Sequence, residues 1–174
     1  MPITTHEERV AAFMARLDAA ERRLIAHASA AHRQGLTGAD AATREQWDWG
    51  QVWAHLAEIV PYWTDRIADL LAVPEPQPKP FGRVKSDAAR IAAIEAGRHG
   101  DVEQQLAVTL SAVEGFRDLL RRVRPGDWAL RGLHAGQGDM TLERIIDFFV
   151  VGHLEEHADQ LDLIAAGGAP AHPQ

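Results

Sequence analysis

Residues 147–164 read DFFVVGHLEEHADQLDLI, and this stretch decides both the fold and the candidate site. Its apolar residues recur every three to four positions, which is the pattern of an amphipathic helix with one face in a core. Two histidines, His153 and His157, stand four residues apart on that apolar face. Side chains at this spacing lie one above the other, so both imidazoles can offer a nitrogen to the same metal ion. The apolar face also carries Ile145, Phe149 and Leu161.

A third histidine interrupts the apolar face of another expected helix. In residues 47–63, WDWGQVWAHLAEIVPYW, His55 lies between Val52 and Ile59 on the face that should enter the core. A buried polar group without a partner costs on the order of 1–3 kcal/mol, and one shared metal ion would give all three histidines a partner. Three histidine ligands leave at least one coordination position open, as in catalytic metal sites. The alternative is that each histidine hydrogen-bonds a neighbouring side chain inside the core.

Helical periodicity occurs in four long segments, and no segment shows the alternation of apolar and polar residues that indicates a strand. The first three segments cover about residues 5–31, 48–72 and 101–123. The first of them carries an apolar stripe that includes Ile25. The last segment begins at Asp139 or Thr141, either of which can cap a helix, and ends at the Gly167-Gly168 pair. The sequence therefore predicts an all-α fold, a four-helix bundle.

The chain is expected to form a single domain over residues 1–174. The proline-rich stretch VPEPQPKP, which starts at Val73, predicts an extended crossover of about residues 73–86 between the second and third long helices. It does not separate two domains, because neither flank alone could close a core. A short helix over about 87–96 should follow it, Pro61 should kink the second long helix, and the tail from about 168 to 174 should fray.

Composition excludes several classes of protein. The 174 residues include no cysteine, so disulfides, thiolate ligands and cysteine nucleophiles are excluded. No apolar run approaches the roughly 20 residues that span a bilayer, and the amino terminus is charged where a secretory signal is apolar, so we expect a cytoplasmic protein that does not engage a membrane. The formal net charge of −7 argues against a nucleic-acid partner.

A family resemblance joins these observations. The segment MTLERIIDFFVVGHLEEHADQLDLI, residues 140–164, resembles the final helix of the DinB-like superfamily, and residues 47–63 resemble its second helix. The resemblance covers the whole chain. It implies a four-helix bundle that binds one divalent metal ion, commonly zinc or nickel, through His55, His153 and His157, with water or a substrate thiol completing the shell. Some relatives replace one histidine by glutamate or have lost the metal, whereas this sequence has all three.

The resemblance also implies a type of chemistry. Family members of known activity include transferases and isomerases that use mycothiol, bacillithiol or glutathione, so we expect a low-molecular-weight thiol to be added to a small-molecule electrophile in detoxification or stress response. Homodimers are usual in the family and are expected here. The mycothiol-dependent maleylpyruvate isomerases that share the bundle carry a further carboxy-terminal domain, for which these residues offer no counterpart, so their specific reaction is not expected.

Two other functions stay open. One is hydrolysis by metal-bound water, and the other is a non-enzymatic, stress-associated binding module whose metal site is structural or vestigial. For hydrolysis the candidate bases are Glu58, one turn beyond His55, and Glu156, which we expect to face solvent or to orient a ligand.

The surroundings of the site give weaker signals. Aromatic residues crowd 47–63, mostly for packing, and Trp53 is the best candidate for a pocket wall that contacts a cofactor or substrate. His27 lies at the edge of an apolar face and is a candidate extra ligand. The other histidines are expected on the surface or in loops: His6, His32, His99, His134 and His172.

Overall fold

The computed structural model of this protein describes residues 5–30, 34–41, 43–72 and 78–167, and this part of the chain is mostly helical. None of its helices combines the length and the apolar composition needed to cross a membrane. The helices are α1 His6–Ala28, α2 Trp49–Ala72, α3 Ala88–Gly97, α4 Val102–Arg122, α5 Leu142–Ile146 and α6 Gly152–Ala165, with a 3₁₀ turn η1 Pro125–Ala129 and a π-helical turn η2 Asp147–Val151.

Several helices begin at residues whose side chains cap them. The hydroxyl oxygen of Thr5 accepts from the N–H of Glu8, while the Glu8 carboxylate accepts from the N–H of Thr5, which is a capping box. At the start of α4 the carboxylate of Asp101 accepts from the N–H of Glu103. Of the two predicted starts of the last long segment, Thr141 caps α5, and Asp139 lies in a strand before it.

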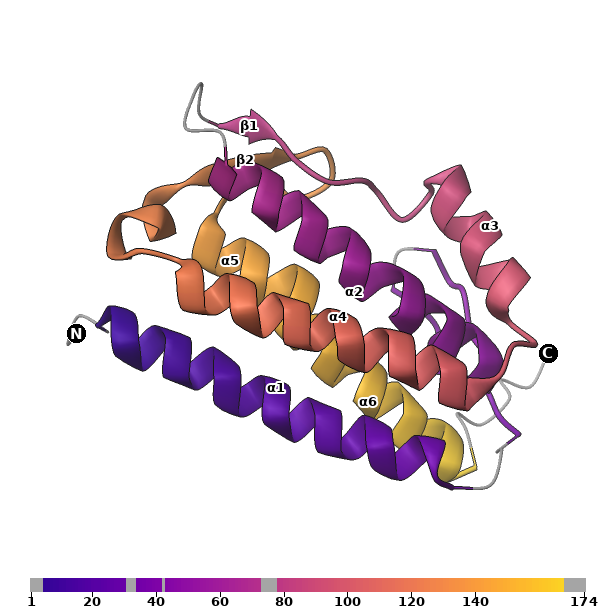
Figure 1. The fold of residues 1–174 in the computed structure, drawn as a ribbon. Helices are drawn as coiled ribbons and strands as arrows, with labels where there is room; N and C mark the ends of the chain where they lie inside the picture. Colours follow the sequence, from indigo (N-terminus) through magenta and orange to yellow (C-terminus); the bar gives the residue numbers. More distant parts are fainter. Residues whose placement is uncertain (1–4, 31–33, 42, 73–77, 168–174) are drawn as a thin grey trace.

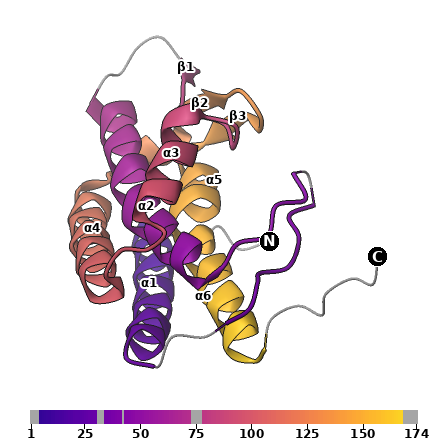
Figure 2. The ribbon, with the colours of Figure 1, turned by 90° about the vertical axis from the view of Figure 1, so that its right-hand side faces the viewer.

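The long helices lie side by side around one core (Figure 1). Helix α2 packs against α4 and α6, and α1 packs against the same two helices. The short helix α3 packs on the outer side of α2, as Figure 2 also shows. Fully buried side chains from all of the long helices fill the space between them, among them Leu17, Leu56, Ile67, Phe116 and Leu161.

One residue of the predicted core faces solvent. Ile25 of α1 is 40% exposed, whereas Leu24 beside it is buried. Consecutive residues of an α-helix point about 100° apart, so both could not face the same core. The prediction for Ile25 is therefore wrong.

A small sheet corrects the prediction that the chain has no strands. Strand β1 Lys79–Pro80 pairs in parallel with β2 Arg131–His134, and β2 pairs antiparallel with β3 Gly138–Thr141. In β2 the buried positions are Gly132 and His134, while Leu133 between them is 47% exposed. Because this reverses the usual placement of apolar and polar residues, the hydrophobic pattern of so short a strand could not reveal it.

Two predicted segments fall partly or wholly outside the described residues. The expected crossover, residues 73–86, is described only from residue 78, where it holds β1 and the chain that leads to α3. The expected frayed tail, residues 168–174, lies outside the described part.

Candidate metal centre

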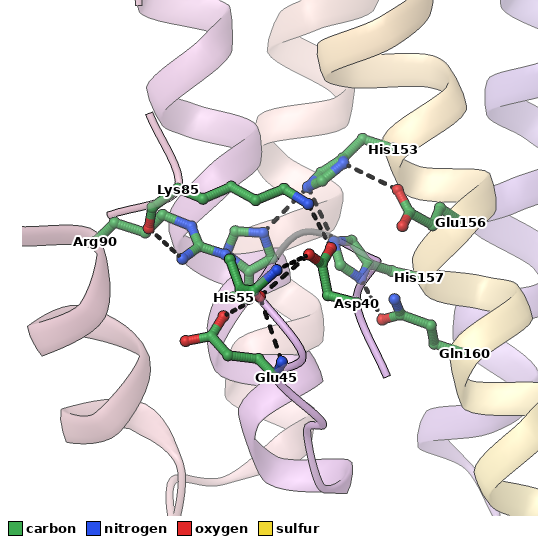
Figure 3. A network of polar contacts seen from close by, with 10 residues as sticks. Asp40, Glu45, His55, Lys85, Arg90, His153, Glu156, His157 and Gln160 are labelled. Carbon is green, nitrogen blue, oxygen red and sulfur yellow. Dashed lines mark hydrogen bonds and ion pairs between the residues drawn. The ribbon is translucent and has the colours of Figure 1, made fainter. Parts of the chain in front are cut away.

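Three histidine side chains converge between α2 and α6. His55 comes from α2, and His153 and His157 come from α6, as Figure 3 shows. The Nε2 atom of His153 lies 3.1 Å from Nε2 of His55 and 3.0 Å from Nε2 of His157. One ligand atom of each residue lies within 4.8 Å of the other two, so the three could hold a metal ion together. The structure thus brings together the three residues that the sequence singled out.

Each of these histidines has a side-chain oxygen near its Nδ1 atom, from the residue three positions further along its own helix. Gln160 Oε1 lies 2.8 Å from Nδ1 of His157. Glu58 and Glu156 stand in the same relation to the other two histidines, each with a carboxylate oxygen 3.5 Å from the Nδ1 atom. Because these oxygens are electron-rich and cannot donate, they favour a proton on the Nδ1 atom that faces them and leave each Nε2 with the lone pair that a metal ligand needs. The oxygen-bearing side chain three residues after each histidine is a signal in the sequence that could have indicated Gln160.

A π-helical turn lies shortly before His153. In η2 the N–H of Gly152 donates to the carbonyl of Asp147, five residues earlier, so the helix gains one residue before α6 begins. A Cβ atom at position 152 would lie 2.7 Å from that carbonyl oxygen. Gly152 is therefore the residue that this close backbone approach requires. Such π turns inside helices occur frequently at functional sites.

Burial keeps two of the imidazoles uncharged. His55 and His157 are 1% and 2% exposed. Burial lowers the pKa of His55 well below its ordinary value, and the neighbouring histidines lower it further. Burial also lowers the pKa of His157 to about 3, with a further contribution from His153. Both rings are thus neutral at physiological pH, which is the form that binds metal.

The donor set fits a divalent ion such as zinc or nickel. Imidazole nitrogens suit both metals. Metal–nitrogen bonds of about 2.0–2.1 Å place two nitrogens of one ion roughly 3.0–3.4 Å apart. The observed separations from His153 Nε2, 3.1 and 3.0 Å, agree with this requirement. With the protons on Nδ1, three lone pairs would face one another, an arrangement that a cation between them stabilises.

The three histidines line a cavity of about 830 Å³. Its lining includes the apolar side chains of Ile59, Trp63 and Phe149 and the cationic side chains of Lys85 and Arg90. A volume in this range is typical of sites for small organic molecules.

The aromatic wall of the cavity differs from the prediction. Trp53 is fully buried, packs against Trp49 and is not among the residues that line the cavity. Two residues apart on a helix, Trp53 and His55 point about 200° apart, so they could not face the same space. Trp47, which precedes α2, takes the place that we predicted for Trp53. Its indole stacks on His157 at 5.9 Å between ring centroids and meets the ring of His55 edge-on at 4.9 Å.

The two candidate bases have different surroundings. Glu58 is mostly buried, forms an ion pair with Arg83 and is not among the residues that line the cavity. Glu156 is exposed and lines the cavity. The hydrogen bond with His153 lowers the pKa of the Glu156 carboxyl, so this group is ionised at neutral pH.

The remaining histidines lie apart from the triad. His27, a candidate extra ligand, instead lies 2.8 Å from Asp162 through its Nε2 atom. His134 was expected on the surface or in a loop, and this is wrong, because it is a buried residue of β2. Its Nε2 donates to the carbonyl of Arg83, and its Nδ1 accepts from two backbone N–H groups of the turn that follows, which explains its burial.

His99 is exposed as predicted. His6 is the first residue of α1, and His32 and His172 lie outside the described residues.

Comparison with known proteins shows that the chain is similar in fold to several solved structures. No protein-family profile and no curated protein matches the sequence. An uncharacterised protein from Escherichia coli UTI89 is similar in structure, with a TM-score of 0.64, 13% sequence identity and 95% of each chain covered. A mycothiol-dependent maleylpyruvate isomerase is similar with a TM-score of 0.64 and 16% identity, and the match covers 91% of this chain but only 63% of the isomerase. An uncharacterised protein from Clostridium difficile 630 follows with a TM-score of 0.58 and 6% identity, over 93% and 96% of the two chains. The chain therefore shares its mostly helical fold with these proteins.

Proposed function

We propose that this chain is a metal-dependent transferase with the DinB-like four-helix bundle and crossover, which adds a low-molecular-weight thiol to a small electrophile in detoxification or stress response. The observation that carries the proposal is the convergence of three Nε2 atoms, from His55, His153 and His157, on the wall of a cavity large enough for small-molecule reactants. A divalent ion held there, zinc or nickel, would lower the pKa of a coordinated thiol and so supply a thiolate near neutral pH.

The thiol has to be a separate molecule, because the chain contains no cysteine. Mycothiol, bacillithiol and glutathione are the cosubstrates that we propose. The structural likeness to a mycothiol-dependent isomerase supports this choice.

Residues of the chain orient the histidine ligands and offer a surface to the electrophile. Gln160 holds the imidazole of His157 by a hydrogen bond to Nδ1, and the carboxylates of Glu58 and Glu156 lie 3.5 Å from the Nδ1 atoms of His55 and His153, which favours Nε2 as the metal-binding nitrogen. Ile59 and Trp63 offer an apolar surface to the carbon skeleton of the electrophile and exclude water beside it. Exclusion of water favours attack by sulfur over hydrolysis.

Hydrolysis is the second candidate, and the position of Glu156 favours it. The carboxylate of Glu156 is ionised, lines the cavity and lies next to His153. It could therefore take a proton from a water molecule at the open position of the site.

The first experiment measures metal content. Protein purified without a nickel column is expected to contain close to one divalent ion per chain, and His153→Ala is expected to lose it. His99→Ala, a change at an exposed histidine, is the matched control and should keep the ion. A protein without metal under these conditions, and without uptake of added zinc or nickel, would overturn the proposal.

The second experiment separates the functions. Cobalt-substituted protein is titrated with mycothiol, bacillithiol and glutathione, and a thiolate-to-cobalt absorption band is expected with at least one of them. That thiol should then be consumed in the presence of an electrophile such as 1-chloro-2,4-dinitrobenzene. Absence of a band with all three thiols, together with metal-dependent ester hydrolysis that Glu156→Gln abolishes, would show a hydrolase instead. Absence of both activities would indicate a binding module.

A further inference from the structure

Arg90 is a buried cation on the wall of the histidine-lined cavity. It lies in the first turn of α3 and is only 7% exposed. Its guanidinium lies over the indole of Trp47, 5.2 Å from the ring centroid, and the same indole contacts His55 and His157. Figure 3 shows the side chain of Arg90 reaching from α3 toward the ring of His55. The positive charge therefore lies beside the candidate metal site.

The guanidinium of Arg90 has no carboxylate partner in the part of the chain that the structure describes. Its one hydrogen bond there runs from Nη1 to the carbonyl oxygen of Lys85, at 2.9 Å, while the backbone N–H of Arg90 donates to Asp87. Burial lowers the pKa of Arg90, and the carboxylates of Glu45, Asp40 and Asp87 oppose this effect without forming an ion pair with it. Most of the guanidinium N–H groups are thus without a protein acceptor.

The other cations of the cavity wall differ from Arg90 in this respect. Each of them already has a carboxylate partner: Arg16 pairs with Asp147 and Glu155, Arg83 with Glu58, and Lys85 with Asp40. Arg117, equally buried but far along α4, pairs with Asp18, Glu21 and Glu114. The lack of a partner is therefore particular to Arg90 among these residues.

The cavity wall carries carboxylates as well as cations, and Arg90 is the cation on it that lacks a carboxylate ion-pair partner among the described residues, so an anionic group of an occupant would bind there. Imidazole binds a metal in its neutral form, so a divalent ion held by three histidines would keep its full charge, which would add to that of Arg90. A buried cation without an ion-pair partner is unfavourable, and an anion that enters the cavity would pair with it. A guanidinium matches a carboxylate well, because two parallel N–H donors meet the two oxygens in one plane.

We infer that Arg90, held against the face of Trp47, binds a carboxylate group of the small molecule that occupies the cavity beside the histidine triad. This inference rests on the proposed function and narrows it, because it makes a carboxylate a required part of the substrate class. The carboxylate can be carried either by the thiol or by the electrophile, and the chemistry of recognition is the same in both cases.

The test compares pairs of probes that differ in the carboxylate. For the thiol, 3-mercaptopropionate is compared with 2-mercaptoethanol. For a molecule without sulfur, cinnamate is compared with cinnamamide. Dissociation constants for zinc-loaded protein are measured by calorimetry. In at least one pair the carboxylate is expected to bind about tenfold more tightly or better, which is the scale of a charged hydrogen-bonded pair.

The variant that tests the residue is Arg90→Gln, which is shorter and retains an uncharged N–H donor but removes the charge. It is expected to lose the preference for the carboxylate while keeping one metal ion per chain. Arg66→Gln, at a half-exposed arginine of α2 that pairs with Asp69, is the control and should keep the preference. Equal preference in wild type and Arg90→Gln, or no preference in either pair for wild type, would overturn the inference.

Two further readouts keep the test decisive. If Arg90→Gln does not fold, Arg90→Lys retains the charge without the planar fork and should weaken carboxylate binding severalfold; unchanged affinity in that variant would overturn the inference. The cobalt titration tests the proposed transferase independently of the carboxylate-binding test. If no thiol gives a thiolate band, the proposed transferase fails, whereas the cinnamate pair still decides whether Arg90 binds a carboxylate.

Discussion

The Nδ1 atom of His157 lies 2.8 Å from the Oε1 atom of Gln160, one turn further along α6. Because an amide oxygen accepts a hydrogen bond, Nδ1 donates and Nε2 keeps its lone pair. This Nε2 lies 3.0 Å from that of His153, so a contact on one side of the ring determines what the other side can bind. Such contacts to the ring nitrogen opposite a metal change affinity and activity when they are removed.

Replacement of Gln160 by Ala should therefore weaken metal binding without abolishing it. We expect a loss of affinity of about 10-fold to 100-fold, because the imidazole is no longer held in one tautomer and one orientation. The measurement is competition for zinc with a chelator of known affinity. Gln104→Ala, at an exposed glutamine of α4, is the matched control and should bind zinc as wild type does. Equal affinities of the two variants would contradict the role of Gln160.

Removal of the metal should lower the melting temperature. A bound ion whose free concentration is 100 times its dissociation constant adds about 2.7 kcal/mol to the free energy of unfolding. We expect a chelator to lower the melting temperature of the wild type and to leave His157→Ala unchanged, since that variant lacks one of the three ligands. Thermal unfolding followed by circular dichroism, with and without chelator, checks this. An equal effect of chelator on both proteins would place the metal elsewhere.

Acid should destabilise the metal-free wild-type protein more than a variant that lacks the buried imidazole of His157. Folding lowers the pKa of His157 to about 3, so below about pH 6.5 the unfolded chain takes up a proton that the folded chain does not. This contribution is absent above pH 6.5, and stability falls progressively as the pH decreases toward 3. At pH 5.5 the loss from His157 is about 1.4 kcal/mol, and His55 acts in the same direction.

Urea unfolding of chelated protein at pH 7.5 and 5.5 measures this difference. The comparison variant is His157→Gln, which removes the titrating group and should show a smaller loss of stability between the two pH values. A loss of equal size in both proteins would mean that His157 is not the source of the acid sensitivity.

A side chain at position 152 should disturb the π turn. The Cβ of Gly152→Ala would lie 2.7 Å from the carbonyl oxygen of Asp147, so the backbone has to shift next to His153. We expect a loss of at least about 1 kcal/mol in stability and weaker zinc binding. Gly115→Ala in α4 is the control. A Cβ there meets nothing within 4 Å, so this change should stabilise the helix by about 0.5–1 kcal/mol. A stable Gly152→Ala variant with wild-type zinc affinity would contradict the prediction.

Much of the helical part of the structure was predictable, because long amphipathic segments carry repeated and redundant signals. Thr141 caps its helix as one of the two predicted starts, and the apolar stripes point into the core. The histidine triad was accessible to sequence reasoning for the same reason. Three imidazoles on apolar stripes conflict with burial unless they share a partner, and helical spacing shows that conflict directly.

The remaining features depend on contacts that spacing along one helix does not encode. Trp47 reaches the site from the chain before α2, and Arg90 reaches it from α3, so their proximity to His55 exists only after folding. The burial of His134 follows from backbone hydrogen bonds in a hairpin turn. The π turn escaped prediction because the apolar run 148–151 is compatible with either helical period.

The single extra residue in η2 also has a consequence for how this fold diversifies. A π turn is wider than an α-helical turn, so it takes up one additional residue at Asp147–Val151 with little change in the direction in which α6 presents its side chains. A protein that lost this residue could therefore close an ordinary α-helical turn here and keep both the packing up to Ile146 and the facing of the histidines. The length of this helix can thus differ by one residue between proteins of this shape while the reactive groups stay in place.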